Sequence, residues 1–136
     1  RGICMGGGLG LAAACDIRIC ETNTKFRMPA ARLGLGYSVD GISRFVSLVG
    51  PQNVLDIFMT AKTFDGHEAL RMGFVAAAAE PDQFEAKISS IAEAIAQNAP
   101  LTLRAVKSAV RAAYSPTADA RSAADAAALA CAKSQD

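Results

Sequence analysis

The sequence predicts an α/β fold, and three observations along its 136 residues lead to this class. Near the N-terminus, a glycine-rich stretch runs directly into a short apolar segment with the composition of a buried helix. Two short segments then alternate polar and apolar residues with the period of two that strands show. From Pro81 onward, apolar residues recur at helical spacing. We therefore expect an α/β core over residues 1–80 and a helical segment over residues 81–136.

The first elements follow from local composition. Residues 7–14 are predicted to form a short helix, because nothing after the glycines breaks it, and its small side chains favour burial on all sides. Residues 16–20 and 25–28 carry the alternation of two short strands, and residues 21–24 between them have turn chemistry. A glycine-rich loop over residues 33–41 follows.

The next segment predicts two consecutive helices. Apolar residues at helical spacing begin at Ile42 and are closed by Gly50. Pro51 can occupy the first position of another helix, with Val54, Leu55 and Phe58 on its inner side.

A short polar helix is predicted after Phe64. Asp65 can cap it, Glu68 stands in the reciprocal capping position three residues later, and Gly73 supplies the stop. Residues 74–78 are expected to form a last small strand.

The C-terminal segment is predicted to hold three helices. The first presents one apolar face, made of Phe84, Ile88, Ile91 and Ile95. After Pro100 a second presents Leu103, Val106 and Val110. An alanine-rich third helix is expected to begin at Ser115-Pro116 and to reach Lys133.

Composition excludes several classes of function. The net charge is +1, the isoelectric point is about 7.9, and Lys and Arg are scattered, so a nucleic-acid partner is not expected. No apolar run approaches the ~20 residues of a membrane span, and no signal segment opens the chain, so we expect a cytoplasmic protein without a membrane partner. The cysteines lack metal-ligand spacing and are expected to be buried, reduced thiols, which leaves no metal site.

The glycine-rich stretch MGGGLG raises the question of function. A Walker phosphate loop requires Gly-Lys-Ser/Thr, and Leu11-Ala-Ala stands there instead. The dinucleotide pattern fits Gly8-x-Gly10-x-x-Ala13 formally, but the strand expected at Asp16 follows too soon for a crossover helix. Two explanations remain: close packing of two backbones, or an oxyanion hole in which bare amides at a helix start stabilise charge developing on an acyl oxygen.

The wider pattern resembles the enoyl-CoA hydratase/isomerase family, also called the crotonase superfamily. Its matching motifs occur in the family's order over essentially the whole chain: Gly6-Gly-Gly8 before an apolar helix, Cys15-Asp-Ile-Arg18, Phe26-x-Met-Pro29, Leu33-Gly-Leu35, Asp40-Gly41 with Arg44-Phe45, Leu48-Val-Gly50, Glu68 to Val75, and Gln97-Asn-Ala-Pro100 leading to Lys107.

This resemblance implies a fold and an assembly. The fold is a crotonase-like (ClpP/crotonase) spiral of ββα units followed by a C-terminal helical trimerisation segment, in a homotrimer or a dimer of trimers. Residues 1–80 would be the second part of the ββα core. The resemblance also implies truncation at both ends, with the second oxyanion amide and most coenzyme A contacts in an absent N-terminal half.

The resemblance further implies which residues form the site. The amide of Gly7 would donate to the thioester oxygen, flanked by Gly6 and Gly8. The positions of the two glutamates that hydratases use are occupied by Gly10 and Ala30, which cannot transfer a proton. Both would instead line an enlarged acyl pocket that accepts bulky or branched chains.

A relocated acid or base is sought in the loop bordering the acyl pocket. Some isomerase relatives hold an acidic residue at the position of Ser38, so Asp40 is a candidate, with a turn or a helix cap as its structural alternative. Tyr37 can donate to the substrate or simply pack. Ser38 and Tyr37 are counted with the substrate-binding residues.

Four other polar residues receive weaker assignments. Asp16 matches an aspartate that is structural in the family, and His67 is expected at the surface. Arg32 and Arg44 can face coenzyme A phosphates or form interface pairs, and the sequence leaves both alternatives open.

Two functions therefore stay open. The first is an acyl-CoA enzyme of fatty acid metabolism, a lyase or isomerase that stabilises a thioester enolate and requires no cofactor beyond the coenzyme A of its substrate. The second is a catalytically silent acyl-CoA-binding member of the family.

Overall fold

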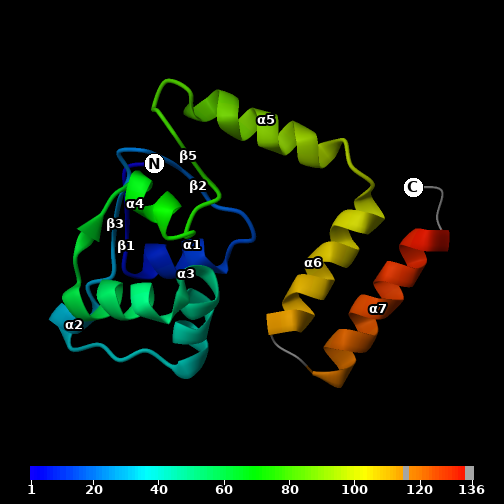
Figure 1. The fold of residues 1–136 in the computed structure, drawn as a ribbon, viewed down its shortest axis with the longest axis horizontal. Helices are drawn as coiled ribbons and strands as arrows, with labels where there is room; N and C mark the ends of the chain where they lie inside the picture. Colours follow the sequence, from blue (N-terminus) through cyan, green and yellow to red (C-terminus); the bar gives the residue numbers. More distant parts are fainter. Residues whose placement is uncertain (115–116, 134–136) are drawn as a thin grey trace. The chain divides into compact units, whose positions relative to one another are not determined.

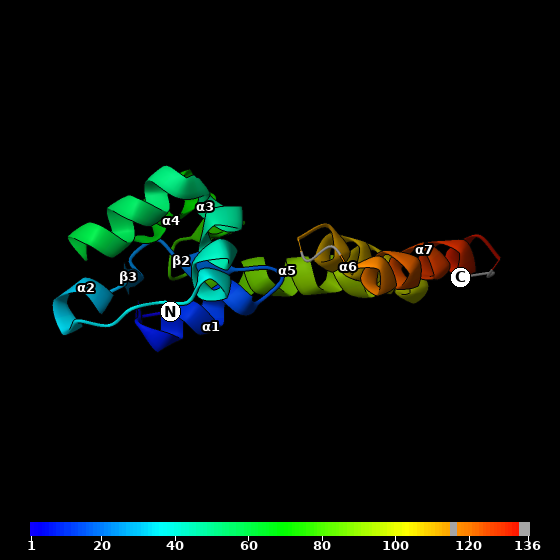
Figure 2. The same cartoon turned by 90° about the horizontal axis from the view of Figure 1, so that it is seen from below.

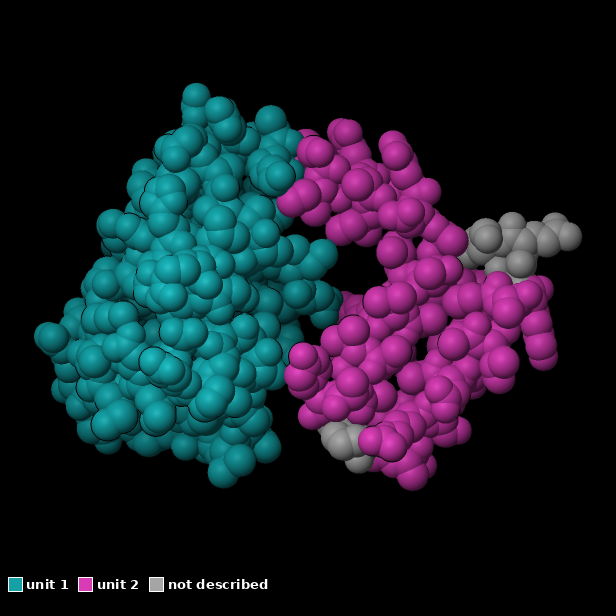
Figure 3. All heavy atoms as spheres, in the orientation of Figure 1, with its two compact units in different colours: residues 1–88 teal, residues 89–136 magenta. Residues whose placement is uncertain are grey.

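The computed structural model of the chain describes residues 1–114 and 117–133 (Figure 1). The predicted start of the last helix at Ser115-Pro116 lies outside these residues. Two compact units divide the chain, Arg1–Ile88 and Ser89–Asp136, and Figure 3 colours them separately. The candidate site lies in the first unit.

Within the described residues, the strands form two small sheets. The first has the order β1-β3-β4 and contains β1 (Ile3–Met5), β3 (Lys25–Arg27) and β4 (Thr63–Phe64). β1 runs parallel to β3, and β4 runs antiparallel to it. The second sheet pairs β2 (Ile19–Glu21) with β5 (Ala77–Ala79) in parallel.

The expected strands are all present, with shifted bounds. The segments predicted at residues 16–20, 25–28 and 74–78 form β2, β3 and β5. The turn between β2 and β3 closes with the Thr24 amide donating to the Glu21 carbonyl at 3.1 Å. Although β2 and β3 are neighbours in sequence, they belong to different sheets, so this turn is a corner and not a hairpin.

Helix α1 (Gly7–Ala14) has the predicted bounds, but it is not buried all round. Leu9 and Ala13 are buried, whereas Leu11 is 71% exposed. The helix packs on β1 and on α3 (Val39–Thr60), and Figures 1 and 2 show it beside α3. The described residues leave its other side uncovered.

The two predicted helices over residues 42–60 form one run with a kink. Within α3, Gly50 has φ 76° and ψ 161°, which interrupts the helical backbone, and Pro51 follows directly. Proline is suited to the first position of a new helical segment, because an amide at that position would have no acceptor within the helix. The four-residue helix α2 (Ala30–Leu33) was not predicted, because one turn is too short to show a period.

Four phenylalanine rings and Leu9 lie in the hydrophobic core of the first unit. The Phe26 ring stacks on Phe64 at 5.3 Å and meets Phe74 edge-on at 5.8 Å, and Phe45 lies parallel to Phe74 at 6.3 Å between ring centroids. Leu9 is completely buried in the same core. Burial of Leu9 in this core therefore anchors α1 to the first unit.

Helix α4 (Gly66–Arg71) begins as predicted, with one difference in its capping. The Asp65 carboxylate accepts from the Glu68 amide at 3.0 Å, and Gly73 (φ 79°) follows the helix end. Glu68 does not complete a reciprocal cap; its carboxylate binds Arg71 at 2.8 and 2.6 Å instead, because a guanidinium is a stronger partner than a neutral amide.

Replacing Asp65 with Ala is expected to lower the free energy of unfolding by about 1 kcal/mol at pH 7. The Glu68 amide holds the pKa of Asp65 below its usual value. A lowered folded pKa stabilises the fold above the unfolded pKa of about 3.9 and loses that contribution as the pH falls through the folded pKa. Urea unfolding at pH 7 and pH 3 measures this.

Asp65→Asn is the matched control, because asparagine caps a helix but carries no charge to titrate. The Asn variant should stay close to the wild type at pH 7 and lose part of the wild type's acid sensitivity. An Ala variant as stable as the wild type at pH 7 would contradict the capping role.

The second unit contains α6 (Pro100–Tyr114) and α7 (Ala118–Lys133), which pack against each other, and the chain reaches it through α5 (Phe84–Ala96). Of the apolar face predicted on α6, Val106 is 57% and Val110 50% exposed, so the described residues do not cover it. Over residues 1–114 and 117–133, no helix combines the length and hydropathy that crossing a membrane requires.

Candidate active site

The segments that open α1 and α2 lie at the same edge of the three-stranded sheet. β1 and β3 are parallel, and their last residues, Met5 and Arg27, are paired. The amide of Gly6 then donates to the carbonyl of Arg27 at 3.0 Å, which extends the ladder by one step. The glycine turn therefore lies beside residues 28–30, which connect β3 to α2.

Among the glycines of this turn, Gly6 has a conformational reason to be glycine. Its φ of 54° and ψ of −119° place it in a region that other residues rarely adopt. A Cβ at Gly7, Gly8 or Gly10 would have no heavy atom within 4 Å. Close packing against the described residues thus does not account for these three positions.

The close backbone approach that glycine permits occurs elsewhere, at Gly66. A Cβ there would lie 2.4 Å from the carbonyl oxygen of Glu21 and 2.9 Å from the Cα of Thr22. No local pattern predicts this contact, because the two segments are far apart along the chain and Gly66 has the sequence context of an ordinary helix start.

The amide end of α1 is open. The first helical hydrogen bond runs from the Gly10 amide to the Gly6 carbonyl at 3.1 Å, and no residue within the described parts of the chain accepts from the amides of Gly7, Gly8 or Leu9. Gly7 and Gly8 are exposed. Aligned amides at a helix start carry partial positive charge, so this end suits an oxygen on which negative charge develops.

The carbonyl end of the same helix is fully occupied. Arg44 donates from Nε to the Ala13 carbonyl at 2.8 Å and from Nη2 to the Ala14 carbonyl at 3.5 Å. Arg18 donates from Nη1 to the carbonyls of Ala12 and Cys15. The structure thus gives Arg44 a helix-capping position, which was not among the alternatives that the sequence left open for it.

Arg18 makes two further contacts, both with Phe74. Its Nε donates to the Phe74 carbonyl at 2.5 Å, and its guanidinium lies 5.6 Å from the centre of the Phe74 ring. Partial burial and the nearby charge of Arg44 lower the pKa of Arg18, while Cys15 and Asp16 act in the opposite direction. Asp16 therefore lies near enough to Arg18 to interact with its charge, in agreement with a structural role.

Two candidate substrate-binding residues make contacts within the chain. The Tyr37 hydroxyl donates to the sulfur of Met28 at 3.3 Å, and its ring meets Phe58 edge-on at 5.3 Å. Ser38 is the N-cap of α3, where its hydroxyl accepts from the Gly41 amide at 3.2 Å. The capping role considered for Asp40 thus belongs to Ser38.

Asp40 lies exposed in the first turn of α3. Its carbonyl accepts from the Ser43 hydroxyl at 3.0 Å, and its carboxylate forms no hydrogen bond or ion pair with the residues that the structure describes. Arg32 is exposed on α2. Gly10 is half-buried on α1, and Ala30, 5% exposed, begins α2.

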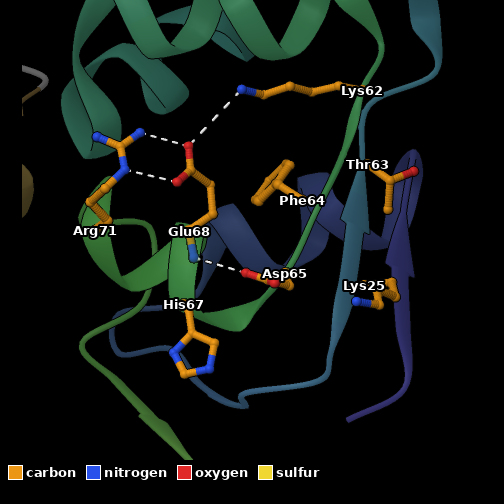
Figure 4. A pocket seen from close by; sticks show the side chains of 8 residues that line it. All are labelled: Lys25, Lys62, Thr63, Phe64, Asp65, His67, Glu68 and Arg71. Carbon is orange, nitrogen blue, oxygen red and sulfur yellow. Dashed lines mark hydrogen bonds and ion pairs between the residues drawn. The ribbon is translucent and has the colours of Figure 1, made fainter.

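A hollow of about 550 Å³ lies beside α4 and was not predicted (Figure 4). The Glu68 carboxylate lies between Arg71 and Lys62, which is 4.0 Å away, and Arg71 holds the pKa of Glu68 below its usual value. His67 lines this hollow from the start of α4. The Glu68 carboxylate pairs with both Lys62 and Arg71, so we assign the hollow no catalytic role.

Comparison with known proteins identifies the family of the chain. Its sequence matches the enoyl-CoA hydratase/isomerase family over residues 1–136. It is 34% identical over 110 residues to the short-chain-enoyl-CoA hydratase of Clostridium acetobutylicum, an alignment that covers 81% of this chain and 42% of that protein.

Two solved structures extend this similarity to the fold. An enoyl-CoA hydratase/isomerase family protein from Hyphomonas neptunium superposes with a TM-score of 0.90 at 29% identity, over 100% of this chain and 52% of the other. A Thermobifida fusca protein described as an enoyl-CoA hydratase, in complex with acetoacetyl-CoA, superposes with a TM-score of 0.81 at 27% identity, over 96% and 52%. The chain spans about half the length of these relatives.

Proposed function

Because the chain belongs to the enoyl-CoA hydratase/isomerase family, or crotonase superfamily, and has its fold, we propose that it processes acyl-CoA thioesters by stabilising an enolate at the amide end of α1. The observation that carries this proposal is the asymmetry of that helix. Its carbonyl end is bound by two guanidinium groups, while the exposed amides of Gly7 and Gly8 have no acceptor among the described residues. An acyl-CoA ligand in the Thermobifida relative supports the same substrate class.

The proposed chemistry needs no group outside the protein and its substrate. The thioester carbonyl accepts a hydrogen bond from the Gly7 amide. When a base removes a proton from the α-carbon, or when water adds to the β-carbon of an enoyl thioester, an electron pair moves to the carbonyl oxygen and this hydrogen bond strengthens. Gly6 sets the direction of this amide through its left-handed backbone.

Proton transfer requires a titratable group, and we propose Asp40 for it. Gly10 and Ala30, at the positions of the family's two glutamates, carry none. The Asp40 carboxylate is exposed and has no hydrogen bond or ion pair within the described residues that would hold it in a structural role.

Asp40→Asn is expected to lower kcat about 10²- to 10⁴-fold. The amide keeps the size of the side chain but cannot exchange a proton. Steady-state kinetics with enoyl-CoA thioesters measure the loss, and Asp40→Glu, which keeps the titratable group, should retain more activity than the Asn variant. An Asn variant as active as the wild type would show that the proton is handled elsewhere.

The absence of a titratable group at positions 10 and 30 also supports a second candidate, a silent acyl-CoA binder. A spectrophotometric assay of the full-length protein against trans-2- and trans-3-enoyl-CoA thioesters separates the two. Turnover establishes the enzyme. Tight binding of the same thioesters without turnover establishes the binder, and neither binding nor turnover would refute both.

We further propose a cytoplasmic homotrimer or dimer of trimers acting in fatty acid metabolism, as the family resemblance implies.

The small residues at positions 10 and 30 lead us to propose a wide acyl pocket. Gly10→Leu should raise KM for a branched enoyl-CoA about 10-fold and change KM for crotonyl-CoA much less. The Cβ of the new side chain has no heavy atom of the described residues within 4 Å. If the wild type binds only the shortest thioesters, the pocket is not enlarged.

A further inference from the structure

We propose that Arg18 and Arg44 are positioning residues for this chemistry, because their charges at the carbonyl end of α1 strengthen the electrostatic stabilisation that the amides offer at its other end. The inference rests on the proposed function and extends it to two residues that do not reach the reacting atoms.

The first argument is the extent of the capping. An α-helix leaves its last four carbonyls without partners, and a left-handed residue usually satisfies one or two of them. In α1 the carbonyls of Ala12, Ala13, Ala14 and Cys15 all accept from Arg18 or Arg44. The Leu11 carbonyl accepts from the Cys15 thiol as well. The unpartnered groups of this helix therefore lie at its amide end.

The second argument is the cost of bringing the two arginines together. Like charges repel: burial and then the charge of Arg44 lower the pKa of Arg18, and Asp16 offsets only part of this effect. A backbone cap is already present, from the Cys15 amide to the Ala12 carbonyl at 3.2 Å, so one guanidinium could satisfy the remaining carbonyls at a smaller electrostatic cost. Pairing two cations is expected where their combined field has a use.

The third argument is distance. Eight residues of α-helix span about 12 Å, so the guanidinium groups are near enough to add positive potential at the amides and too far to bind the thioester. Partial burial of Arg18 limits its screening by salt. Its bond to the Phe74 carbonyl and its contact with the buried Phe74 ring hold the charge in place.

The test uses variants of the full-length protein and a chromophoric thioester, 4-(dimethylamino)cinnamoyl-CoA, whose absorption moves to the red when its carbonyl is polarised. Arg44→Met and Arg18→Met should each lower kcat about 3- to 10-fold and reduce the red shift, with little change in KM. Arg44→Lys keeps the charge and should keep most of the red shift.

Arg71→Met is the matched control. The Arg71 side chain lies in the last turn of α4 and donates to the Glu68 carboxylate at 2.8 and 2.6 Å, so its charge is paired with a carboxylate and not with the carbonyl end of α1. It should leave the red shift unchanged. Circular dichroism identifies any variant that fails to fold. Arg44→Gln, which can still donate to a carbonyl but carries no charge, then replaces it and should also reduce the red shift.

Three results would overturn the proposal: an unchanged red shift in a folded Met variant, an equal loss in Arg71→Met, or complete loss of the shift in Arg44→Lys. If the wild-type protein neither shifts the chromophore nor turns over any thioester, the proposed function itself fails and this inference with it. A wild-type shift that the Met variants retain refutes the role of the arginines alone.

Discussion

Replacing Gly7 with Pro is expected to lower kcat for enoyl-CoA thioesters about 100- to 1000-fold, the loss that follows removal of one oxyanion donor. Gly7 is the first residue of α1, a position where proline is favoured because its missing amide would have no helical partner. The backbone angles of Gly6, φ 54° and ψ −119°, are the mirror image of an extended conformation. A glycine that precedes proline can adopt them. The substitution therefore deletes the amide and should preserve the fold.

Gly7→Ala is the matched control, since it adds a side chain and keeps the amide. A Cβ at this position has no heavy atom within 4 Å, so any loss in the Ala variant reports contact with the substrate or with a segment outside residues 1–136. We expect the Ala variant to retain far more activity than the Pro variant. Equal losses in both would mean that the side-chain volume, not the amide, is what the site cannot accept.

Replacing Gly66 with Ala is expected to lower the free energy of unfolding by about 1–3 kcal/mol, the usual cost of forcing extra volume into a packed site. The new Cβ would lie 2.4 Å from the Glu21 oxygen and 2.9 Å from both the Cα and the oxygen of Thr22. These are main-chain atoms, so relief requires moving the start of α4 away from the end of β2. That movement would weaken the bond from the Gly66 amide to the Thr22 carbonyl, now 3.0 Å.

Gly36→Ala provides the comparison for Gly66→Ala. A Cβ at Gly36 would have no heavy atom within 4 Å, and the φ of this residue is not positive, so alanine there should be neutral or slightly stabilising. Urea unfolding of the wild type and the two variants measures the difference. A Gly66→Ala variant as stable as Gly36→Ala would show that the contact at the start of α4 relaxes without cost.

Elements with strong local signals were predicted correctly. The glycines and alanines indicated the bounds of α1, Gly50-Pro51 marked the break in α3, and Asp65 marked the start of α4. These features depend on residues within a few positions of one another. The sheet assignments of β2 and β3 depend on partners far along the chain, which a local pattern does not contain.

Burial was predicted less well than secondary structure. The apolar composition of α1 led to the expectation of burial on all sides, yet Leu11 is 71% exposed. Composition gives the number of apolar residues but not the number of neighbours available to cover them. The same reasoning applies to Val106 and Val110 on α6.

For the candidate site, the sequence indicated the glycine turn and its lack of side chains, but not the two arginines at the carbonyl end of α1. Arg18 and Arg44 are far apart along the chain, and each looks like an ordinary surface cation in its own segment. Their convergence on α1 is a tertiary feature. Ser38 and Asp40 compete for one capping position, and backbone geometry, which gives it to Ser38, decides between them.

The main-chain origin of the donors in α1 has a consequence for how such a protein changes over evolutionary time. Amides at Gly7 and Gly8 exist whatever side chains surround them, provided that Gly6 keeps its backbone conformation. Substitutions at positions 10 and 30 can therefore add, remove or relocate proton-transferring groups without disturbing the charge-stabilising element. A new reaction on the same thioester then requires one or two side-chain changes and no rebuilding of the scaffold.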